Sequence, residues 1–268
     1  MKKILVLGGG QLGQRLKFHY PEIELLSSSQ LLRHPQSPKD DSFWVNFGLL
    51  ESFDIIINTI AITDTRFCEC ADNEGHCEKI NVQLPIQLSA YCAHKKKKFV
   101  QISTGCVYAE SNGISDENSL VDPSYGYAKN KLKAENGLSE NDLILRGRLF
   151  YSTLSCKSNL LYKIKNFKQL TSELNSFTFV DDLAKAAYVL SDFNQCGIFN
   201  VACKDVASLY EIGEMVGLKD VEKISSASFR EKTGIVIPNI MLDVSKVNEY
   251  ILTSDLELTI KYCWRVLN

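Results

Sequence analysis

Short apolar runs alternate with amphipathic stretches along the first half of the chain. Runs rich in Ile, Leu, Val and Phe predict buried strands at residues 3–7, 22–26, 54–58, 99–103 and 143–145. Stretches with apolar residues at helical spacing predict helices at 11–20, 78–94 and 125–138, and a weaker one at 43–50. Strands and helices that alternate in this order are typical of an α/β fold with a parallel sheet and crossover helices.

The pattern is less regular after about residue 150. Here we predict helices at 158–167, 180–190 and 208–216, one further strand at 198–201, and a mixed tail from Ser225. The sequence shows no internal repeat and no low-complexity linker. We therefore predict a first domain at residues 1–150, with returning segments near 177–202. Residues 151–268 would mainly form a smaller substrate-binding lobe.

A glycine-rich turn directly follows the first predicted strand. Its sequence, a G-x-G-x-x-G pattern between a strand and a helix, is Gly8-Gly9-Gly10-Gln11-Leu12-Gly13. Gly8 permits the tight turn, Gly10 lets the backbone approach a pyrophosphate, and Gly13 lets the helix pack closely on the strand. Helix N-terminal amides can then hold the phosphate charge. This context predicts a Rossmann-type dinucleotide-binding domain, and a glycine-rich turn without a ligand is the alternative.

A tyrosine and a lysine lie four positions apart at the start of the predicted helix 125–138. On one helix face, the Lys129 ammonium can hold the pKa of the Tyr125 phenol well below its usual value of about 10. Thr104, at the end of the strand before it, can hydrogen-bond the same substrate oxygen. Such a trio protonates a carbonyl oxygen while a nicotinamide delivers hydride, or catalyses the reverse reaction. Together with the glycine turn, it predicts a nicotinamide-dependent oxidoreductase.

Composition and charge exclude several other classes of protein. The chain has 268 residues, 45% of them hydrophobic and 23% charged, which is typical of a globular protein with a sizeable core. A net charge of −2 gives no reason to expect nucleic acid or an anionic membrane as a partner. We find no apolar stretch that spans a bilayer and no signal peptide, and the nine cysteines show no regular pairing. We therefore expect a cytoplasmic protein in a reducing compartment.

One cysteine-rich segment raises the question of a metal. It contains Cys68, Cys70 and Cys77 with His76. Their spacing matches no common structural zinc pattern, and the segment is typical of an acidic helix start after a strand. We therefore expect no metal site.

Taken together, these features resemble the extended short-chain dehydrogenase/reductases, specifically the dTDP-4-dehydrorhamnose reductase-like group. The resemblance is collinear and covers almost the whole chain. Besides the glycine turn it is carried by 54–61, Asn81-Val82, 103–108, 125–129 with Ala134-Glu135, 145–148, 177–184, 199–201 and 237–246. It implies an NAD(P)-dependent enzyme with a nucleotide-sugar substrate, and it leaves a homodimer open.

The resemblance also implies roles for a cysteine and a second lysine. Thr104-Gly105-Cys106-Val107-Tyr108 is similar to T-G-C-I-F in bifunctional 3,5-epimerase/4-reductases of the rhamnose pathway and to S-S-C-I-Y in GDP-fucose synthases. That cysteine is an epimerisation acid/base in those enzymes, which implies this role for Cys106. Lys163 falls where the rhamnose-type enzymes carry a second base. The alternative for Cys106 is a small buried hydrophobe at a strand end.

Two departures from the family pattern concern the cofactor. The glycine turn is one residue shorter than the usual G-x-x-G-x-x-G, which alters the phosphate contacts. After the second strand, residues 26–29 contain no Asp or Glu that would bind an adenosine ribose 2′-hydroxyl. Ser27 and Arg33 suit a 2′-phosphate better, so we expect NADP(H) rather than NAD(H). The family pattern implies further cofactor contacts at Gly8, Gly10, Gln11, Leu12, Gly13, Thr59, Ala61, Asn81 and Lys129.

We therefore predict an NADP(H)-dependent reductase, or an epimerase/reductase, of a nucleotide-linked 4-keto-6-deoxy sugar. Tyr125 would protonate the C4 oxygen while hydride reaches C4, with Lys129 on the nicotinamide ribose and Thr104 on the substrate oxygen. Two alternatives stay open: a nucleotide-sugar 4-epimerase with tightly bound NAD, and a non-catalytic reductase-like regulatory subunit. Gly105 and Cys106 stand where a dehydratase carries an acidic pair, and the intact trio argues against a regulatory role.

Overall fold

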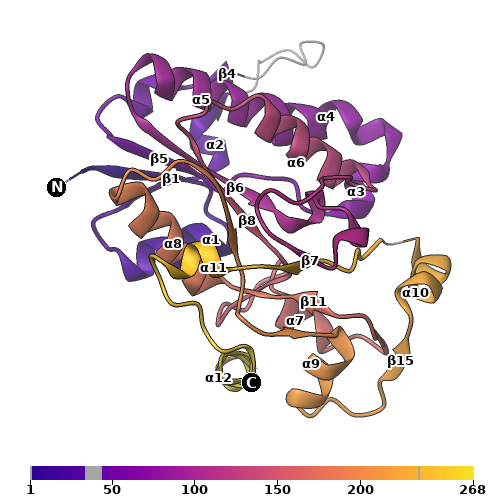
Figure 1. The fold of residues 1–268 in the computed structure, drawn as a ribbon. Coiled ribbons are helices and arrows are strands. Elements are labelled where there is room, and N and C mark those ends of the chain that lie inside the picture. Colours follow the sequence, from indigo (N-terminus) through magenta and orange to yellow (C-terminus); the bar gives the residue numbers. More distant parts are fainter. Residues whose placement is uncertain (1, 34–43, 235) are drawn as a thin grey trace.

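A six-stranded parallel sheet forms the centre of the protein (Figure 1). A computed structural model describes residues 2–33, 44–234 and 236–268. The strand order is β13-β8-β6-β5-β1-β2. The strands are β1 (Ile4–Leu7), β2 (Glu24–Leu26), β5 (Ile55–Asn58), β6 (Lys98–Thr104), β8 (Leu143–Gly147) and β13 (Gly197–Val201). This sheet confirms the predicted Rossmann-type fold, and β13 is the returning segment expected near 198–201.

Helices cover both faces of the sheet. Figure 1 shows α1 (Gln11–His19) and α8 (Val180–Asp192) on one face, and α5 (Leu84–His94) and α6 (Gly126–Asn136) on the other. Successive residues of a strand point to opposite faces. In β1, Ile4 and Val6 therefore enter the core under α1 and α8, whereas Leu5 and Leu7 enter the core under α5. Two buried faces explain why β1 is apolar at successive positions rather than alternating.

Two helix predictions need correction. The segment 78–94 is helical, but as α4 (Glu74–Glu78), a π-helical turn (Lys79–Gln83) and α5 in succession. The helix predicted at 43–50 is wrong. The described part of that segment is β4 (Trp44–Val45), which pairs with β3 (Leu32–Arg33), and a 3₁₀ turn (Phe47–Leu50). Gly48 lies inside that turn and disfavours a longer helix, because glycine is a poor helix former.

The remaining elements are short, apart from α12 (Leu256–Leu267). The short helices are α2 (Ser28–Leu31), α3 (Thr65–Glu69), α7 (Leu160–Ile164), α9 (Leu209–Met215), α10 (Ser226–Thr233) and α11 (Ser245–Asn248). Further 3₁₀ turns span Ala71–Asn73, Gly105–Val107 and Glu110–Asn112. The strands are β7 (Ile114–Ser115), β9 (Phe150–Tyr151), β10 (Gln169–Thr171), β11 (Asn175–Ser176), β12 (Thr178–Phe179), β14 (Val206–Ala207), β15 (Glu222–Ile224) and β16 (Met241–Leu242).

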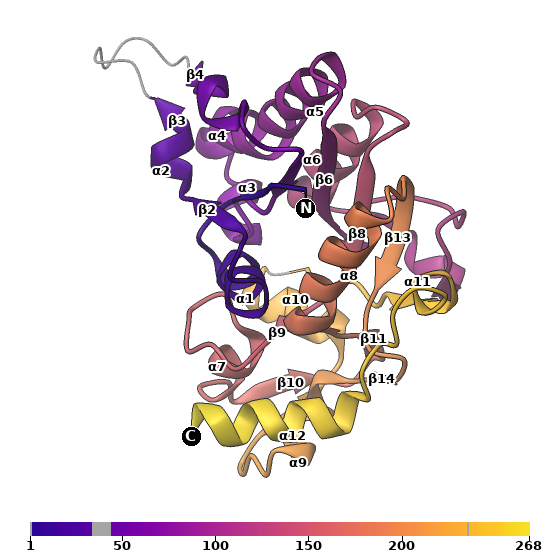
Figure 2. The ribbon, with the colours of Figure 1, turned by 90° about the vertical axis from the view of Figure 1, so that its left-hand side faces the viewer.

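A second hydrophobic core lies in the lobe beside the sheet. It joins α7, α9 and α12, and Figure 2 shows α12 and α9 next to each other at the base of the molecule. The sequence prediction treated α12 as part of a mixed tail. Its apolar face consists of Leu256, Ile260 and Cys263, and Asp255 caps its first turn by accepting a hydrogen bond from the Leu258 amide. In the described part of the chain, no helix is long and apolar enough to cross a bilayer.

The glycine turn has the geometry that its sequence predicts. Gly8 has a φ of +111°, in the region that favours glycine, and its amide donates to the Leu26 carbonyl at 2.7 Å. A Cβ on Gly13 would lie 2.0 Å from the Gly8 carbonyl oxygen, so only glycine lets α1 pack this closely on β1. The N-terminus of α1 consequently faces the carboxyl end of the sheet.

Gly13→Ala should destabilise the protein by about 1–3 kcal/mol, as overpacked sites do, because backbone must move to admit the methyl group. Gly9→Ala is the matched control in the same turn, since a Cβ there meets no described atom within 4 Å. Urea unfolding measures both free energies. Equal stabilities of the two variants would contradict the close approach of α1 to β1.

Candidate active site

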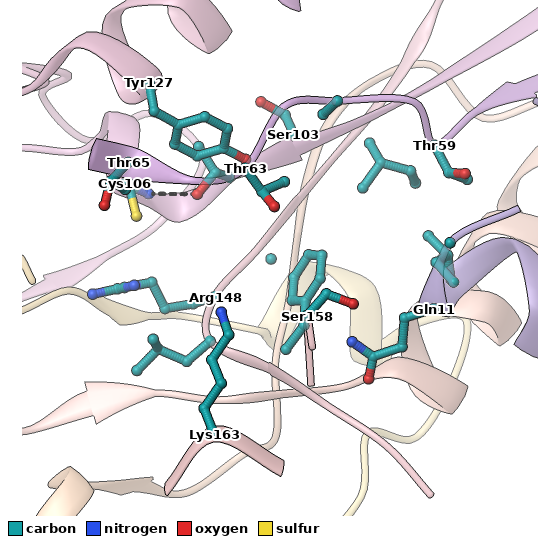
Figure 3. Close-up of a pocket in the computed structure, with 18 of the residues that line it drawn as sticks. Gln11, Thr59, Thr63, Thr65, Ser103, Cys106, Tyr127, Arg148, Ser158 and Lys163 are labelled. Carbon is teal, nitrogen blue, oxygen red and sulfur yellow. Dashed lines mark hydrogen bonds between the residues drawn. The ribbon is translucent and has the colours of Figure 1, made fainter. Parts of the chain in front are cut away.

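A cavity of about 330 Å³ lies at the carboxyl end of the sheet, where open α/β sheets bind ligands. Its walls come from the glycine turn, the segments after β5, β6 and β8, the start of α6, and α7. Figure 3 shows Gln11 and Thr59 at one end and Cys106 and Arg148 at the opposite end. The ring of Tyr127 extends between these two ends. We call them the glycine-turn end and the cysteine end.

Five of the eleven residues predicted to bind the cofactor line the glycine-turn end. They are Gly10, Gln11, Leu12, Thr59 and Ala61. The Gln11 side chain also accepts a hydrogen bond from Ser152 at 2.5 Å, which ties the turn to the lobe. Gly8 and Gly13 do not line the cavity, and they shape the turn instead.

Among the other predicted cofactor residues, Asn81 and Ser27 do not line this cavity. Asn81 is 1% exposed, and its side-chain amide binds both the amide and the carbonyl of Ile62, at 2.8 and 3.0 Å. It therefore holds the loop after β5 rather than facing a ligand. Ser27 follows β2 and forms a capping box with Gln30 at the start of α2. The backbone of Arg33 belongs to β3, and its side chain lies outside the described part of the structure.

The predicted hydroxyl and thiol lie together at the end of β6. Thr104 ends the strand, and its Oγ1 accepts a hydrogen bond from the Cys106 amide at 3.2 Å (Figure 3). Both side chains line the cavity and are almost fully buried, at 6% and 5% exposure. The turn Gly105–Val107 thus brings the Thr104 hydroxyl and the Cys106 thiol to the same cavity wall.

The structure does not bring Lys129 to the site, so the predicted pairing of Tyr125 with Lys129 is wrong. Tyr125 lines the cavity, but it precedes the first helical residue and has an extended backbone, with φ −145° and ψ 161°. The spacing of four residues therefore does not stack the two side chains. Lys129 is exposed, and the pKa of Tyr125 is raised, mainly by burial, rather than lowered.

A second tyrosine–lysine pair with the same spacing takes that place. Tyr127 lines the cavity and Lys131 follows one helical turn later, on the buried face of α6. Lys131 is 2% exposed, and its Nζ donates to the Ile102 carbonyl at 2.7 Å, just before Ser103 and Thr104. Burial lowers the pKa of Lys131 to about 8, and burial raises the pKa of Tyr127. At neutral pH the lysine is mainly charged and the phenol is protonated.

The sequence does carry a signal for this pair. The Y-x-x-x-K pattern also fits residues 127–131, which overlap the motif from Tyr125 to Lys129. Ala128, Lys131 and Glu135 recur at the spacing of one helix face, and all three are buried. The helix face on which each lysine lies, together with the spacing, therefore identifies Lys131 as the buried lysine.

A buried ion pair holds α6 against two strands. Glu135 and Arg146 are 8% and 3% exposed, and Arg146 Nη2 lies 2.5 Å from Glu135 Oε2. The Ser103 hydroxyl donates to the same carboxylate. Attraction to Glu135 keeps the pKa of Arg146 raised despite its burial. The start of α6 is fixed separately, because Glu69 accepts from the Gly126 amide at 2.5 Å.

Two basic side chains line the cavity opposite the tyrosines. Arg148 follows β8 and is 5% exposed, whereas Lys163 extends from α7 into the cavity (Figure 3). The Asn159 side chain caps α7 and also binds the carbonyls of Ser152 and Leu154, so the segment before Lys163 is tightly held.

A second cavity, of about 380 Å³, adjoins the cysteine end. It shares Tyr125 and Thr65 with the first cavity, and it includes the arginines Arg66 on α3 and Arg230 on α10. No residue of the glycine turn lines it. The arrangement therefore offers a phosphate-binding turn at one end, acid–base groups in the middle and a basic region beyond.

Comparisons with known proteins agree with this geometry. The family described as RmlD substrate binding domain matches residues 1–228. A trifunctional UDP-glucose 4,6-dehydratase/UDP-4-keto-6-deoxy-D-glucose 3,5-epimerase/UDP-4-keto-L-rhamnose-reductase of Arabidopsis thaliana is 25% identical over 291 aligned positions. That alignment covers 98% of this chain but 42% of the relative, so the chain spans less than half of that protein.

Solved structures show the same fold. A dTDP-4-dehydrorhamnose reductase from Clostridium acetobutylicum superposes with a TM-score of 0.80 at 22% identity, covering 99% of both chains. A dTDP-4-dehydrorhamnose reductase from Bacillus anthracis in complex with NADP superposes with a TM-score of 0.80 at 19% identity, again covering 99% of both. At such identities these likenesses establish the fold alone, and they confirm the predicted Rossmann-type α/β fold.

Lys131 should make the stability of the protein depend on pH. Because its pKa is about 8 in the folded protein and 10.5 ordinarily, the unfolded chain binds more protons between these values. The contribution of Lys131 to the free energy of unfolding should therefore rise with pH across this window. Lys131→Met should remove that rise, whereas Lys129→Met, the exposed control, should keep it. Urea unfolding at several pH values measures the slopes, and equal slopes in both variants would rule out a depressed pKa at Lys131.

Proposed function

This chain belongs to the RmlD substrate binding domain family of nucleotide-sugar reductases, and we propose that it reduces a nucleotide-linked 4-keto-6-deoxy sugar with NADPH. One observation carries the proposal: the cavity-lining Tyr127 stands one helical turn before the buried Lys131, beside Thr104. The glycine turn at the other end of the same cavity suits a dinucleotide pyrophosphate. The names of the similar proteins, which include reductases and an NADP complex, support the same chemistry.

The glycine-turn end would hold the cofactor, which supplies hydride to C4 of the sugar. Gly10 and Leu12, at the N-terminus of α1, present backbone amides to the pyrophosphate. Thr59 and Ala61 would flank the cofactor from the loop that Asn81 holds. NADP(H) is favoured over NAD(H), because the Leu26–Ser29 segment has no carboxylate to repel a 2′-phosphate.

Tyr127 would be the proton donor to the C4 oxygen. Its raised pKa keeps the phenol protonated, which is the form that a donor needs. As the proton leaves, the buried Lys131 ammonium would stabilise the phenolate. The Thr104 hydroxyl would hydrogen-bond the sugar oxygen. The role first assigned to Tyr125 and Lys129 thus moves two residues along the chain.

Epimerisation next to the ketone is the second part of the proposal. A carbon centre inverts when one group removes its proton from one face and another group returns a proton to the opposite face. Cys106 and Lys163 lie on opposing walls of the cavity, as Figure 3 shows, and both line it. Cys106 would act at C3 or C5, whose protons the C4 ketone acidifies. The basic second cavity, with Arg66 and Arg230, would accept the nucleotide diphosphate.

NADPH absorbance tests the reaction directly. The protein is mixed with UDP- or dTDP-linked 4-keto-6-deoxyglucose, and NADPH oxidation is followed with each. Solvent deuterium in the product at C3 or C5 reports epimerisation. Reduction without carbon-bound deuterium would leave a plain 4-ketoreductase. Bound NAD that never exchanges would favour a nucleotide-sugar 4-epimerase instead, and nucleotide binding without turnover would favour a regulatory subunit.

Tyr127→Phe and Lys131→Met should each lower the rate of reduction by about 10²–10⁴-fold, as the loss of a positioned acid–base group does. Lys129→Met is the matched control on the same helix and should retain wild-type kcat, since Lys129 is exposed outside the cavity. Stopped-flow NADPH oxidation measures all three. A slow Lys129→Met variant together with an active Lys131→Met variant would instead support Tyr125 and Lys129 as the acid–base pair.

Cys106→Ser should block deuterium entry and spare the reduction of a sugar supplied already epimerised. A serine keeps the size and a hydroxyl, but a thiol, with an ordinary pKa of about 8.5, is far more acidic. Lys163→Ala should weaken the same step if α7 supplies the second base. Proton NMR of the product in D₂O measures both, and unchanged deuterium entry in Cys106→Ser would make Cys106 a packing residue.

Arg33→Ala should narrow the preference for NADPH over NADH, because a guanidinium can pair with a 2′-phosphate and an alanine cannot. The dissociation constants of both cofactors, from fluorescence titration, measure this preference. If the wild type prefers NADH, or if Arg33→Ala keeps the wild-type ratio of the two dissociation constants, Ser27 and Arg33 do not bind the 2′-phosphate.

A further inference from the structure

Tyr125 has no role in the proposed reduction, in which Tyr127 is the proton donor. Tyr125 is 5% exposed and forms a small buried cluster with Cys106 and Ala128. It stands at the N-cap position of α6 without using its side chain as a cap, since Glu69 binds the Gly126 amide instead. Helix capping therefore does not explain why this phenol is buried beside a thiol.

Tyr125 and Cys106 pack in the same buried cluster, and both line the active-site cavity. Burial raises the pKa of Tyr125 most, and both the negative charge and the hydrogen bonding of Cys106 raise it further. The pKa of Tyr127 is raised by Cys106 as well, but there burial again dominates. The Tyr125 hydroxyl is thus the neighbour with which the thiol can exchange a proton.

Arg148 supplies the positive charge at this end of the cavity, and its charge lowers the pKa of both tyrosines. Its Nη2 donates to Asn175 Oδ1 at 2.9 Å and to the Pro238 carbonyl, so the guanidinium is held in place. Its buried Nε has no hydrogen-bond partner among the described residues. The cation can therefore stabilise a thiolate or phenolate that forms beside it.

Tyr125 also stands between the two cavities. It lines the active-site cavity together with Cys106, and it lines the second cavity, which Cys106 does not reach. Among the described residues, Thr65 also borders both cavities. A sugar that fills the first cavity would cover the Cys106 thiol, which is 5% exposed even without it. Proton exchange with solvent would then have to pass through a neighbouring side chain.

We propose that Tyr125 is a proton-relay residue that connects Cys106 with the second cavity. The inference rests on the proposed epimerisation. The Cys106 thiolate takes a proton from the carbon beside the ketone, so that the C–H bond breaks, its electron pair enters the enolate and an S–H bond forms. The thiol then passes this proton to the Tyr125 oxygen, while the Tyr125 hydroxyl proton leaves to water that shares the second cavity with the nucleotide diphosphate. Thiolate and phenol are both restored.

The test compares deuterium entry with hydride transfer. The keto sugar is incubated in D₂O with the protein and NADP⁺, and NMR follows deuterium at C3 and C5, while NADPH oxidation is measured separately. Tyr125→Phe keeps the ring, and it should lower the ratio of deuterium entry to hydride transfer by about 10²-fold or more, as the loss of a proton-transfer group does. Tyr127→Phe should raise this ratio, because it slows hydride transfer. Thr65→Val, the matched control at the boundary of the two cavities, should leave it close to the wild-type value.

Rescue separates a relay from a packing role. Imidazole buffer can carry protons, so rising imidazole concentration should restore deuterium entry in Tyr125→Phe, whereas it cannot repair misplaced packing. Urea unfolding checks that the variant is folded. An unchanged ratio, or a loss that imidazole does not restore, would overturn the relay. NADPH oxidation without deuterium entry in the wild type would also overturn it and leave the reductase standing. Deuterium entry without NADPH oxidation would instead overturn the reductase and keep the relay.

Discussion

The active site depends on the buried ion pair between Glu135 and Arg146. This pair joins α6 to β8, and the Ser103 hydroxyl adds the end of β6 to the same carboxylate. The three elements joined here carry Tyr127 and Lys131, Thr104 and Cys106, and Arg148. Removing one partner would leave a buried charge without compensation, which typically costs about 3–5 kcal/mol. The pair therefore sets the register between the acid–base groups without touching the cavity.

Two neighbouring tyrosines stand at the cavity with different electrostatic surroundings. Tyr127 belongs to the helix and has a buried ammonium one turn further on, near the strand end that carries Thr104. Tyr125 precedes the helix and has a thiol as its neighbour. Pairs of titratable groups in unlike environments are suited to separate proton-transfer tasks. Adjacent, chemically identical side chains can thus serve reduction and epimerisation independently.

Much of the fold follows from the sequence, whereas the register of the site does not. The apolar runs predicted the parallel sheet, because a strand buried on both faces carries apolar residues at successive positions. The glycine turn predicted the close approach of α1 to β1, because only a residue without a Cβ fits at Gly13. Thr104 and Cys106 follow from their place at a strand end. The spacing fits both Tyr125–Lys129 and Tyr127–Lys131, so spacing alone does not select the pair. Helix boundaries are the least determined part of a helix, so the spacing also does not show that Tyr125 precedes α6. Lys131 is the buried lysine because it shares a helix face with Ala128 and Glu135.

The path of the chain constrains how this protein can be taken apart. The lobe core is assembled from residues between Tyr151 and Phe179, between Cys203 and Ile212, and between Leu256 and Cys263. Between the first two of these stretches the chain returns to the sheet as α8 and β13, and α11 packs on β13 before α12 completes the lobe. No single cut in the chain separates the lobe from the sheet. Recombination that exchanges the substrate lobe between relatives would have to preserve several crossings at once, so new substrate specificity is more accessible through changes in the cavity walls than through transfer of the lobe as a unit.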